Sequence, residues 1–343
     1  MTDFLLDSLV FSAKAVFVFF LFILCIAVFA AIFAKIVKNK SKNDEDDWKK
    51  QLVIENLSSS YAELRDQVSS QVLDEKSFAE MKKRQEEKAK TRKDSITPQS
   101  PKKRLFVLDF DGDIKASQAV SLGHEIDAVL SIAENSDEVV VKITSPGGAV
   151  AGYGLAASQL ARLRDRGIKL TVCIDTVAAS GGYMMACIAN RIVASPFAIV
   201  GSIGVVAEFP NFNKLLHRFD IDYEQETAGE YKRTLSMLGD NSDPKAREKF
   251  REQLEACYKL FRQHVGKYRP QLNLDEIATG EFWHGTDALK NHLVDEIGTS
   301  NEYILSRIDY MNVFAFRQKK KKSLRSKVLA LSSMLYRLAG RMY

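Results

Sequence analysis

Two short stretches of this sequence combine a possible nucleophile with small residues. The first is TVAASGGY at 176–183, in which an apolar run ends and Ser180 precedes two glycines. A serine between a strand and a helix has the setting of a nucleophile elbow, because small neighbours admit a substrate and the helix N-terminus supplies free N–H groups. Ala178 stands where that elbow usually has glycine. Taken alone, the stretch is more typical of an N-cap serine with packing glycines.

The second stretch is SPGG at 145–148, at the end of another apolar run. Pro146 fixes the local backbone direction, and Gly147 and Gly148 leave backbone N–H groups uncovered by side chains. Such a loop beside Ser180 could complete an oxyanion hole for acyl transfer. Taken alone, it is equally typical of an ordinary turn.

A nucleophilic serine needs a general base. The chain has five histidines, and we interpret each as a surface or packing residue because none lies in a small-residue loop: His124, His217, His264, His284 and His292. A lysine can serve instead when burial removes water from its ammonium. Lowering a lysine pKa from about 10.4 to about 7.5 takes about 4 kcal/mol. Composition does not select one lysine from so many.

The elements that must position these residues alternate between strand and helix patterns. Short apolar runs predict strands at 105–110, 139–143, 168–175, 192–195 and 198–206. Helical patterns fall at 117–133, 151–165, 181–189 and 244–266. Alternation of this kind predicts βαβ units and a mainly parallel sheet, in the α/β class. We place this domain at 105–310.

The region at 41–104 is predicted to be a charged helix followed by a flexible linker. Apolar residues at helical spacing predict a helix over 51–73, with a stripe of Val53, Leu57, Tyr61, Leu64, Val68 and Val72. Residues 82–104 have few apolar side chains and two prolines, which predicts a linker.

Residues 1–40 are predicted to hold a membrane anchor. The span at 15–34 has 20 residues without a charge, enough to cross a bilayer core of about 30 Å. A cleaved signal peptide is the alternative, but the run exceeds the ~7–15 residues of a signal core, and Asp3 and Asp7 precede it. Lys35, Lys38, Lys40 and Lys42 follow the span. By the positive-inside rule they favour the cytoplasmic side of the membrane for the domain, and the opposite face is the alternative.

Residues 311–343 are predicted to form a basic amphipathic tail. A four-lysine run precedes apolar residues at spacings of four, three and four: Leu324, Val328, Leu331 and Leu335. Such a helix suits an anionic membrane surface, and a disordered solubilising tail is the alternative. The net charge of +5 is mild and no nucleic-acid-binding module is visible, so no nucleic-acid partner is expected. The four cysteines make no C-x-x-C pair, and neither a metal nor a cofactor is expected.

Three stretches carry a resemblance to a known family. They read SPGGAVAGYGLAASQLARLRDRGIKLTVCIDTVAASGGYMMACIANRIVASPFAIVGSIGVVAEFPNFN at 145–213, AGEYKRTLSMLGDN at 228–241 and ATGEFWHGTDALKNHLVDEIG at 278–298. Their order and spacing resemble the signal peptide peptidase A family of Ser–Lys peptidases, most closely its short proteobacterial SohB type. The resemblance covers residues 105–310, and less specifically the first 100 residues. One local departure is Thr144, where related loops often have asparagine.

The resemblance implies a role for each matching position. Ser180 matches the nucleophile, Lys232 the general base, and Ser202 the serine that hydrogen-bonds the lysine. The glycines of the SPGG loop match the oxyanion loop, with either Gly147 or Gly148 as the donor. Gly181, after the nucleophile, is expected to contribute an oxyanion N–H as well. The family fold resembles the ClpP/crotonase type and its members form rings, in some of which serine and lysine come from neighbouring subunits.

The sequence therefore predicts a membrane-bound serine endopeptidase. The implied substrates are signal peptides or membrane-associated and misfolded polypeptides, and the implied partners are the lipid bilayer and further copies of the chain in a homo-oligomeric ring. Two other functions remain open. One is an acyl-CoA hydratase or isomerase on the same fold, which would need positioned carboxylates. The other is a non-catalytic membrane scaffold, which has no physical need for the set Ser180, Lys232 and Ser202.

Overall fold

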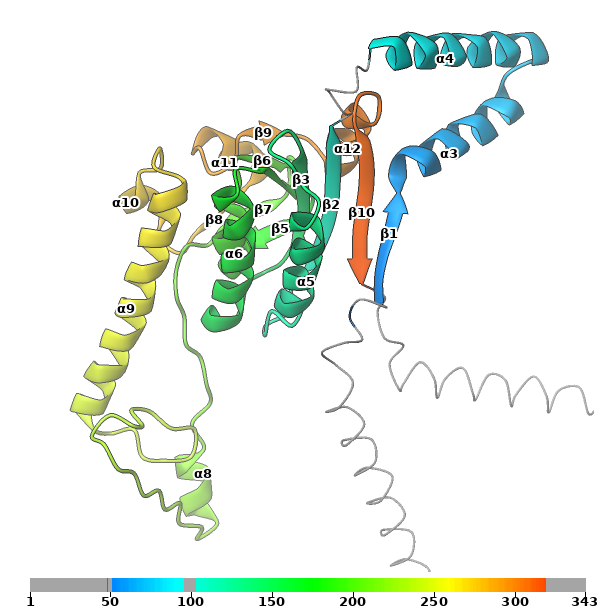
Figure 1. The fold of residues 1–343 in the computed structure, drawn as a ribbon. Coiled ribbons are helices and arrows are strands. Elements are labelled where there is room, and N and C mark those ends of the chain that lie inside the picture. The colour runs from blue at the N-terminus through cyan, green and yellow to red at the C-terminus, as the bar shows by residue number, and fades with distance from the viewer. Residues whose placement is uncertain (1–47, 49–50, 96–102, 319–343) are drawn as a thin grey trace, which may run out of the picture. The chain divides into compact units, whose positions relative to one another are not determined.

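The computed structural model describes residues 48, 51–95 and 103–318. Nearly all of them belong to one compact unit that begins at Val53. The predicted α/β class is confirmed, because strands and helices alternate through the unit (Figure 1).

A seven-stranded sheet forms the centre of this unit, and its strand order is β1-β10-β2-β3-β4-β6-β9. The pairings from β10 through β9 are all parallel. Its strands are β1 (Leu52–Asn56), β2 (Arg104–Asp111), β3 (Glu138–Thr144), β4 (Lys169–Ile174), β6 (Arg191–Ala194), β9 (Glu296–Ile297) and β10 (Asn312–Gln318).

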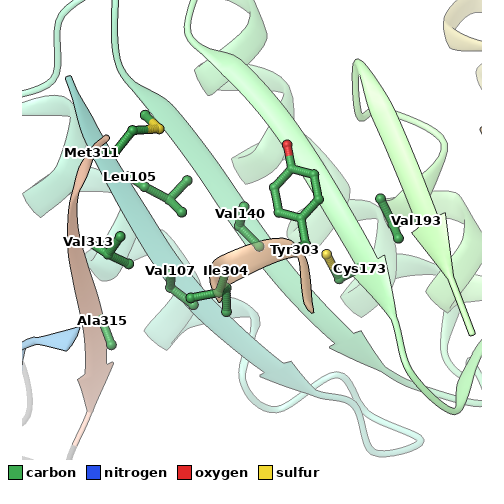
Figure 2. Close-up of a cluster of buried hydrophobic side chains, with 10 residues drawn as sticks. All are labelled: Leu105, Val107, Val140, Cys173, Val193, Tyr303, Ile304, Met311, Val313 and Ala315. Carbon is green, nitrogen blue, oxygen red and sulfur yellow. The ribbon is translucent and has the colours of Figure 1, made fainter. Parts of the chain in front are cut away.

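Helices cover both faces of this sheet. Because successive strand residues point to opposite faces, Leu105 and Val107 of β2 pack with α12 (Ser300–Ile308), as Figure 2 shows. Phe110 points the other way and contacts Tyr153 of α6 (Val150–Asp165). Helix α5 (Ala119–Leu130) packs beside α6 (Figure 1). Burial on both faces explains why these strands read as continuous apolar runs rather than alternating ones.

A smaller three-stranded sheet stands at the carboxyl end of the large one. It consists of β5 (Val177–Ala179), β7 (Ile199–Gly201) and β8 (Phe282–His284). β5 and β7 are parallel, whereas β7 and β8 are antiparallel. A bridge between Ser145 and Ala178 joins the end of β3 to β5. The predicted strand at 198–206 thus ends at Gly201, and the chain continues without regular structure.

Further helices lie around this smaller sheet and beyond it. They are α7 (Gly181–Ala186), α8 (Asn213–Arg218), α9 (Pro244–Tyr268), α10 (Leu274–Ile277) and α11 (Gly285–Lys290). Asp243 caps α9 by accepting a hydrogen bond from the Lys245 N–H at 2.9 Å, and Pro244 occupies the first helical position.

Several segments differ from the sequence-based expectation. Residues 312–318, assigned to the tail, form β10, because Val313, Ala315 and Phe316 are buried beside β2. The segment read as a flexible linker is helical up to residue 95 in α4 (Glu75–Ser95). Lysine, glutamate, alanine, glutamine and arginine dominate α4, and these are strong helix formers although they bury little apolar surface. The two prolines that suggested a linker lie after its end.

The helix expected over 51–73 is also shorter than predicted. Its first residues form β1, and the helix α3 (Leu57–Val72) begins after Asn56, whose side chain accepts a hydrogen bond from the Ser59 N–H. Ser58 accepts a hydrogen bond from the Val313 N–H at 2.9 Å, which ties α3 to β10. The later part of the stripe, Leu64 and Val68, is exposed.

No helix among the described residues is long and apolar enough to cross a bilayer. The predicted span at 15–34 and the predicted tail beyond residue 318 lie outside the described residues.

Candidate active site

Ser180 occupies a sharp turn between β5 and α7. Its backbone has φ 50° and ψ −118°, a conformation that residues other than glycine adopt only when neighbouring structure holds them. The Ser180 N–H donates to the Gly201 carbonyl at 2.8 Å, which fixes the turn to β7. The residues next to Ser180 in the sequence have small side chains up to Tyr183, and Ser180 itself is half-buried. This geometry is the strained strand-to-helix turn of a nucleophile elbow.

The SPGG loop lies directly against that turn. A Cβ atom on Gly147, which has φ 94°, would come within 2.7 Å of the Ser180 Cβ and 2.8 Å of the Gly181 nitrogen. A side chain at position 147 would therefore occupy the space in front of the serine. The Ala179 N–H donates to the Ser145 carbonyl at 3.0 Å, so the loop and the turn are held by backbone bonds on both sides.

The two loops open into one cleft of about 1100 Å³. Ser180, Ser202, Gly147, Gly148 and Gly181 all line it. All but one of the residues predicted to form the site are thus brought together from separate chain segments.

Ser202 follows β7 and, like Ser180, has a positive φ. It has φ 51°, and its N–H donates to the Glu281 carbonyl at 2.7 Å. Gly201, immediately before it, accepts the hydrogen bond from Ser180. The two serines are therefore linked through a single peptide of β7, and both are half-buried.

Helix α9 supplies an apolar wall to the cleft. Leu254, Tyr258 and Phe261 line it at spacings of four and three, together with Met184 from α7. The wall is fixed at two points. His264 Nε2 lies 2.9 Å from the Met184 carbonyl oxygen, and the Tyr258 hydroxyl donates to the Ala278 carbonyl oxygen.

His264 has a packing role in the structure. Burial lowers the pKa of its imidazole, and the ring nitrogen nearest to α7 is bonded to the Met184 carbonyl oxygen. A neutral histidine whose Nε2–H donates to a backbone carbonyl packs one helix on another, as the sequence predicted for it.

Lys232 lies outside the cleft, in the segment between β7 and α9. It is exposed, and its neighbour Tyr231 has a ring centroid 5.2 Å from Lys249 Nζ near the start of α9. His264, which contacts α7, lies toward the other end of that helix. At about 1.5 Å per residue, the stretch of α9 between Lys249 and His264 is roughly 20 Å long.

Lys232 is not among the residues that line the cleft, and among the described residues its amine makes no hydrogen bond to Ser180. Figure 1 shows the segment with α8 beyond the start of α9, at the opposite end of that helix from α10. A contact between the rings of Phe209 and Phe250, whose centroids lie 6.0 Å apart, holds it there.

The candidate oxyanion donors differ in whether their N–H groups are already bonded. The Gly147 N–H donates to the Ser145 hydroxyl at 3.1 Å. Among the described residues, neither the Gly148 N–H nor that of Gly181, the first residue of α7, has an acceptor. The structure favours Gly148 over Gly147, a choice that the sequence left open.

Sequence reasoning missed two groups of residues around the cleft. The α9 wall was seen only as an amphipathic helix, and its spacing alone does not show what the apolar face covers. Ser145 and Tyr153, buried behind the glycine loop, were read as part of a turn and of a helix. Among the described residues, no group of three potential metal ligands occurs.

Comparison with known proteins gives matches over almost the whole chain. Residues 3–160 match the model described as "Peptidase family S49 N-terminal", and residues 162–313 match "Peptidase family S49". "Probable protease SohB" of Haemophilus influenzae is 50% identical over 235 residues, 68% of this chain and 66% of that protein. "Probable protease SohB" of Buchnera aphidicola from Acyrthosiphon pisum is 53% identical over 208 residues, 61% of this chain and 62% of that protein.

More distant relatives also match. "Protease 4" of Haemophilus influenzae is 28% identical and covers 59% of this chain and 34% of its own. Among solved structures, a lysine-to-alanine mutant of the 1510-N membrane-bound stomatin-specific protease, in complex with a substrate peptide, aligns at 14% identity and a TM-score of 0.41. That alignment covers 68% of this chain and 98% of the other. This chain spans a little under two thirds of the length of the SohB relatives given above.

Proposed function

The chain belongs to peptidase family S49, and from this premise we propose that it is a membrane-bound serine endopeptidase with Ser180 as nucleophile and Lys232 as general base. One observation carries the proposal. A serine held at positive φ on a strand-to-helix turn faces a glycine loop with a free N–H inside a single cleft. That arrangement suits acyl transfer, which needs an exposed nucleophile and donors aimed at the developing oxyanion.

In the proposed reaction, Ser180 Oγ attacks the carbonyl carbon of the peptide while its proton passes to the neutral amine of Lys232. The former carbonyl oxygen becomes negatively charged, and the N–H groups of Gly148 and Gly181 stabilise it. Collapse breaks the C–N bond as Lys232 returns the proton to the leaving nitrogen. Water then attacks the acyl-enzyme, with Lys232 again accepting the proton, and free Ser180 is regenerated.

Lys232 is proposed to come from a neighbouring copy of the chain. Within one chain Lys232 does not line the cleft that holds Ser180, and its side chain is exposed. Docking into a neighbour's cleft would bring the amine to the serine and bury it. The segment that carries Lys232 also exposes apolar side chains, including Val206 at 78% and Phe219 at 67%, as expected of a surface that another subunit covers. A homo-oligomeric ring of the ClpP/crotonase type accommodates this exchange.

Ser202 is proposed to hold the lysine amine. It lines the same cleft as Ser180, and the peptide that precedes it already bonds the Ser180 turn. A neutral amine on a flexible four-carbon stem needs such a partner to stay aimed at the serine hydroxyl.

Ser202→Ala is expected to leave folding intact and to lower kcat by about 5- to 150-fold, the effect of losing one orienting hydrogen bond of ~1–3 kcal/mol. KM should change little because substrate contacts are untouched. Ser202→Gly is the matched comparison, since it relieves the positive φ but also lacks the hydroxyl, and it should lose as much activity. Steady-state kinetics decide the matter, and a wild-type kcat in both variants would make Ser202 a structural turn residue.

The proposed setting is a bacterial inner membrane. The apolar run at 15–34 would anchor the chain, and the lysines after it favour a cytoplasmic catalytic domain. The proposed substrates are signal peptides or membrane-associated and misfolded polypeptides. The apolar wall of Leu254, Tyr258 and Phe261 supports this class, because it would contact apolar side chains bound beside Ser180.

Parallel assays of peptide and acyl-CoA thioester cleavage distinguish the peptidase from the hydratase or isomerase alternative. The expected result is hydrolysis of apolar peptides and no hydration of an enoyl-CoA. Among the described residues lining the cleft, the only carboxylate is the exposed Glu255 on α9, whereas hydration needs positioned carboxylates. Turnover of the enoyl-CoA without peptide cleavage would contradict the assignment, and absence of both activities would support a scaffold.

A further inference from the structure

Behind the glycine loop, two buried hydroxyls form a chain of hydrogen bonds that no step of the proposed reaction uses. Ser145 Oγ and Tyr153 Oη lie 2.5 Å apart, and both side chains have no exposed surface. The Tyr153 hydroxyl donates to the Asp113 carbonyl at 2.8 Å. The Gly147 N–H donates to Ser145 Oγ at 3.1 Å.

The direction of this chain follows from counting hydrogens. A tyrosine hydroxyl has one hydrogen, and Tyr153 gives it to Asp113. The bond between the two hydroxyls must then be donated by Ser145 and accepted by Tyr153. Ser145 Oγ is left as the acceptor for the Gly147 N–H, so the position of that glycine is set by Tyr153 through Ser145.

The surroundings leave this chain little room to rearrange. A Cβ atom on Gly112 would lie 2.4 Å from Ser145 Oγ and 2.5 Å from Tyr153 Oη, so the backbone there packs directly on the two hydroxyls. A Cβ atom on Gly181 would lie 2.4 Å from the Tyr153 ring. The tyrosine therefore contacts the residue after the nucleophile with its ring and controls the glycine loop with its hydroxyl.

We infer that Ser145 and Tyr153 are positioning residues for the oxyanion loop. Together they turn the Gly147 N–H away from the cleft, and the next N–H, that of Gly148, is the one left to face the substrate. Without the Tyr153 hydroxyl, the Ser145 hydroxyl loses the acceptor that fixes its direction, and the hydrogen bond from the Gly147 N–H loses that support. This role rests on the proposed acyl-transfer chemistry, but the hydrogen-bond chain itself can be tested without any activity.

The first test follows hydrogen exchange in peptides covering 145–149 by mass spectrometry on the full chain. Tyr153→Phe removes only the hydroxyl and is expected to speed exchange of one amide by about tenfold or more, the loss of one fixed hydrogen bond. Tyr183→Phe is the matched control, because Tyr183 is equally buried, lies on α7 and donates one bond to the Leu293 carbonyl at 2.9 Å. Equal exchange in the two variants would show that the chain does not hold the loop.

The second test separates positioning from a general loss of stability. Tyr153→Phe and Ser145→Ala should each lower kcat by about 10- to 100-fold at nearly constant KM, less than or comparable to the loss of a whole oxyanion donor. Their double variant should be no worse than the less active single variant, since both break one chain. Tyr183→Phe should lose similar thermal stability and keep its kcat.

The affinity of a peptide aldehyde is a measurement that would not change if Tyr153 and Ser145 had only a structural role. Ser180 Oγ adds to the aldehyde carbon, and the resulting hemiacetal oxygen occupies the oxyanion position. Its affinity should weaken in Tyr153→Phe by about the same factor as kcat/KM, whereas a non-covalent product peptide should bind as in wild type. Equal weakening of both ligands would overturn the inference. A wild-type chain that cleaves no peptide would instead reject the proposed function and leave the exchange result standing.

Discussion

Replacing Ser180 with alanine is expected to lower peptide hydrolysis by about 10⁴- to 10⁶-fold, because the nucleophile and its base act as a unit and the remaining cleft only binds the substrate. Folding should be retained, since alanine keeps the backbone bond to Gly201. The positive φ of Ser180 costs alanine no more than it costs serine. The expected effect therefore falls on kcat with little change in substrate affinity.

The measurement is single-turnover cleavage of an apolar peptide by purified full-length chain in detergent. Ser158→Ala is the matched control, as Ser158 lies on α6 outside the cleft and bonds only the Gly154 carbonyl in its own helix. A fluorophosphonate should label wild type and the control but not Ser180→Ala. Cleavage by Ser180→Ala at a rate close to that of the control would assign the chemistry to another group.

Replacing Lys232 should be almost as damaging, although the side chain is exposed within its own chain. Lys232→Ala is expected to lower kcat by at least about 10³-fold, the loss of the general base, while thermal unfolding stays within about a degree of wild type. Lys232→Arg should be equally inactive, because a guanidinium stays protonated and accepts no proton.

The neighbouring Arg233 offers a control for charge. It is exposed on the same segment, so Arg233→Ala removes one positive charge beside Lys232 and should keep at least about half of the activity. The double variant of Ser180 and Lys232 should be no worse than either single variant. Robust cleavage by Lys232→Ala at neutral pH would mean that a different group accepts the proton.

Much of the site could be anticipated because its parts are local. The predicted strands at 139–143 and 168–175 are β3 and β4, which pair in parallel, and the ends of parallel strands meet at one edge of a sheet. The small residues around Ser180 and in the SPGG loop reflect close backbone approach, which the contacts of Gly147 and Gly181 confirm. Local patterns were sufficient because each motif occupies a few consecutive residues.

The rest depends on contacts between distant segments. Nothing near Tyr153 shows that its hydroxyl reaches Ser145 and Asp113, because an aromatic residue in an amphipathic helix is ordinarily a packing residue. The pairing of β10 with β2 joins segments at opposite ends of the domain. Because a lysine run follows β10, the sequence analysis assigned this strand to the basic tail. Lys232 was identified by family resemblance alone, since an exposed lysine in an irregular segment has no local signature.

Subunit mixing tests the central claim most directly. Inactive Ser180→Ala and inactive Lys232→Ala chains are combined in equal amounts under conditions where mass spectrometry of the intact oligomer shows that subunits exchange. If each site joins the serine of one copy to the lysine of the next, random mixing restores wild-type pairs at about one quarter of the sites, and a similar share of peptide hydrolysis returns. No activity in oligomers shown to contain both variants would contradict a site shared between neighbouring chains.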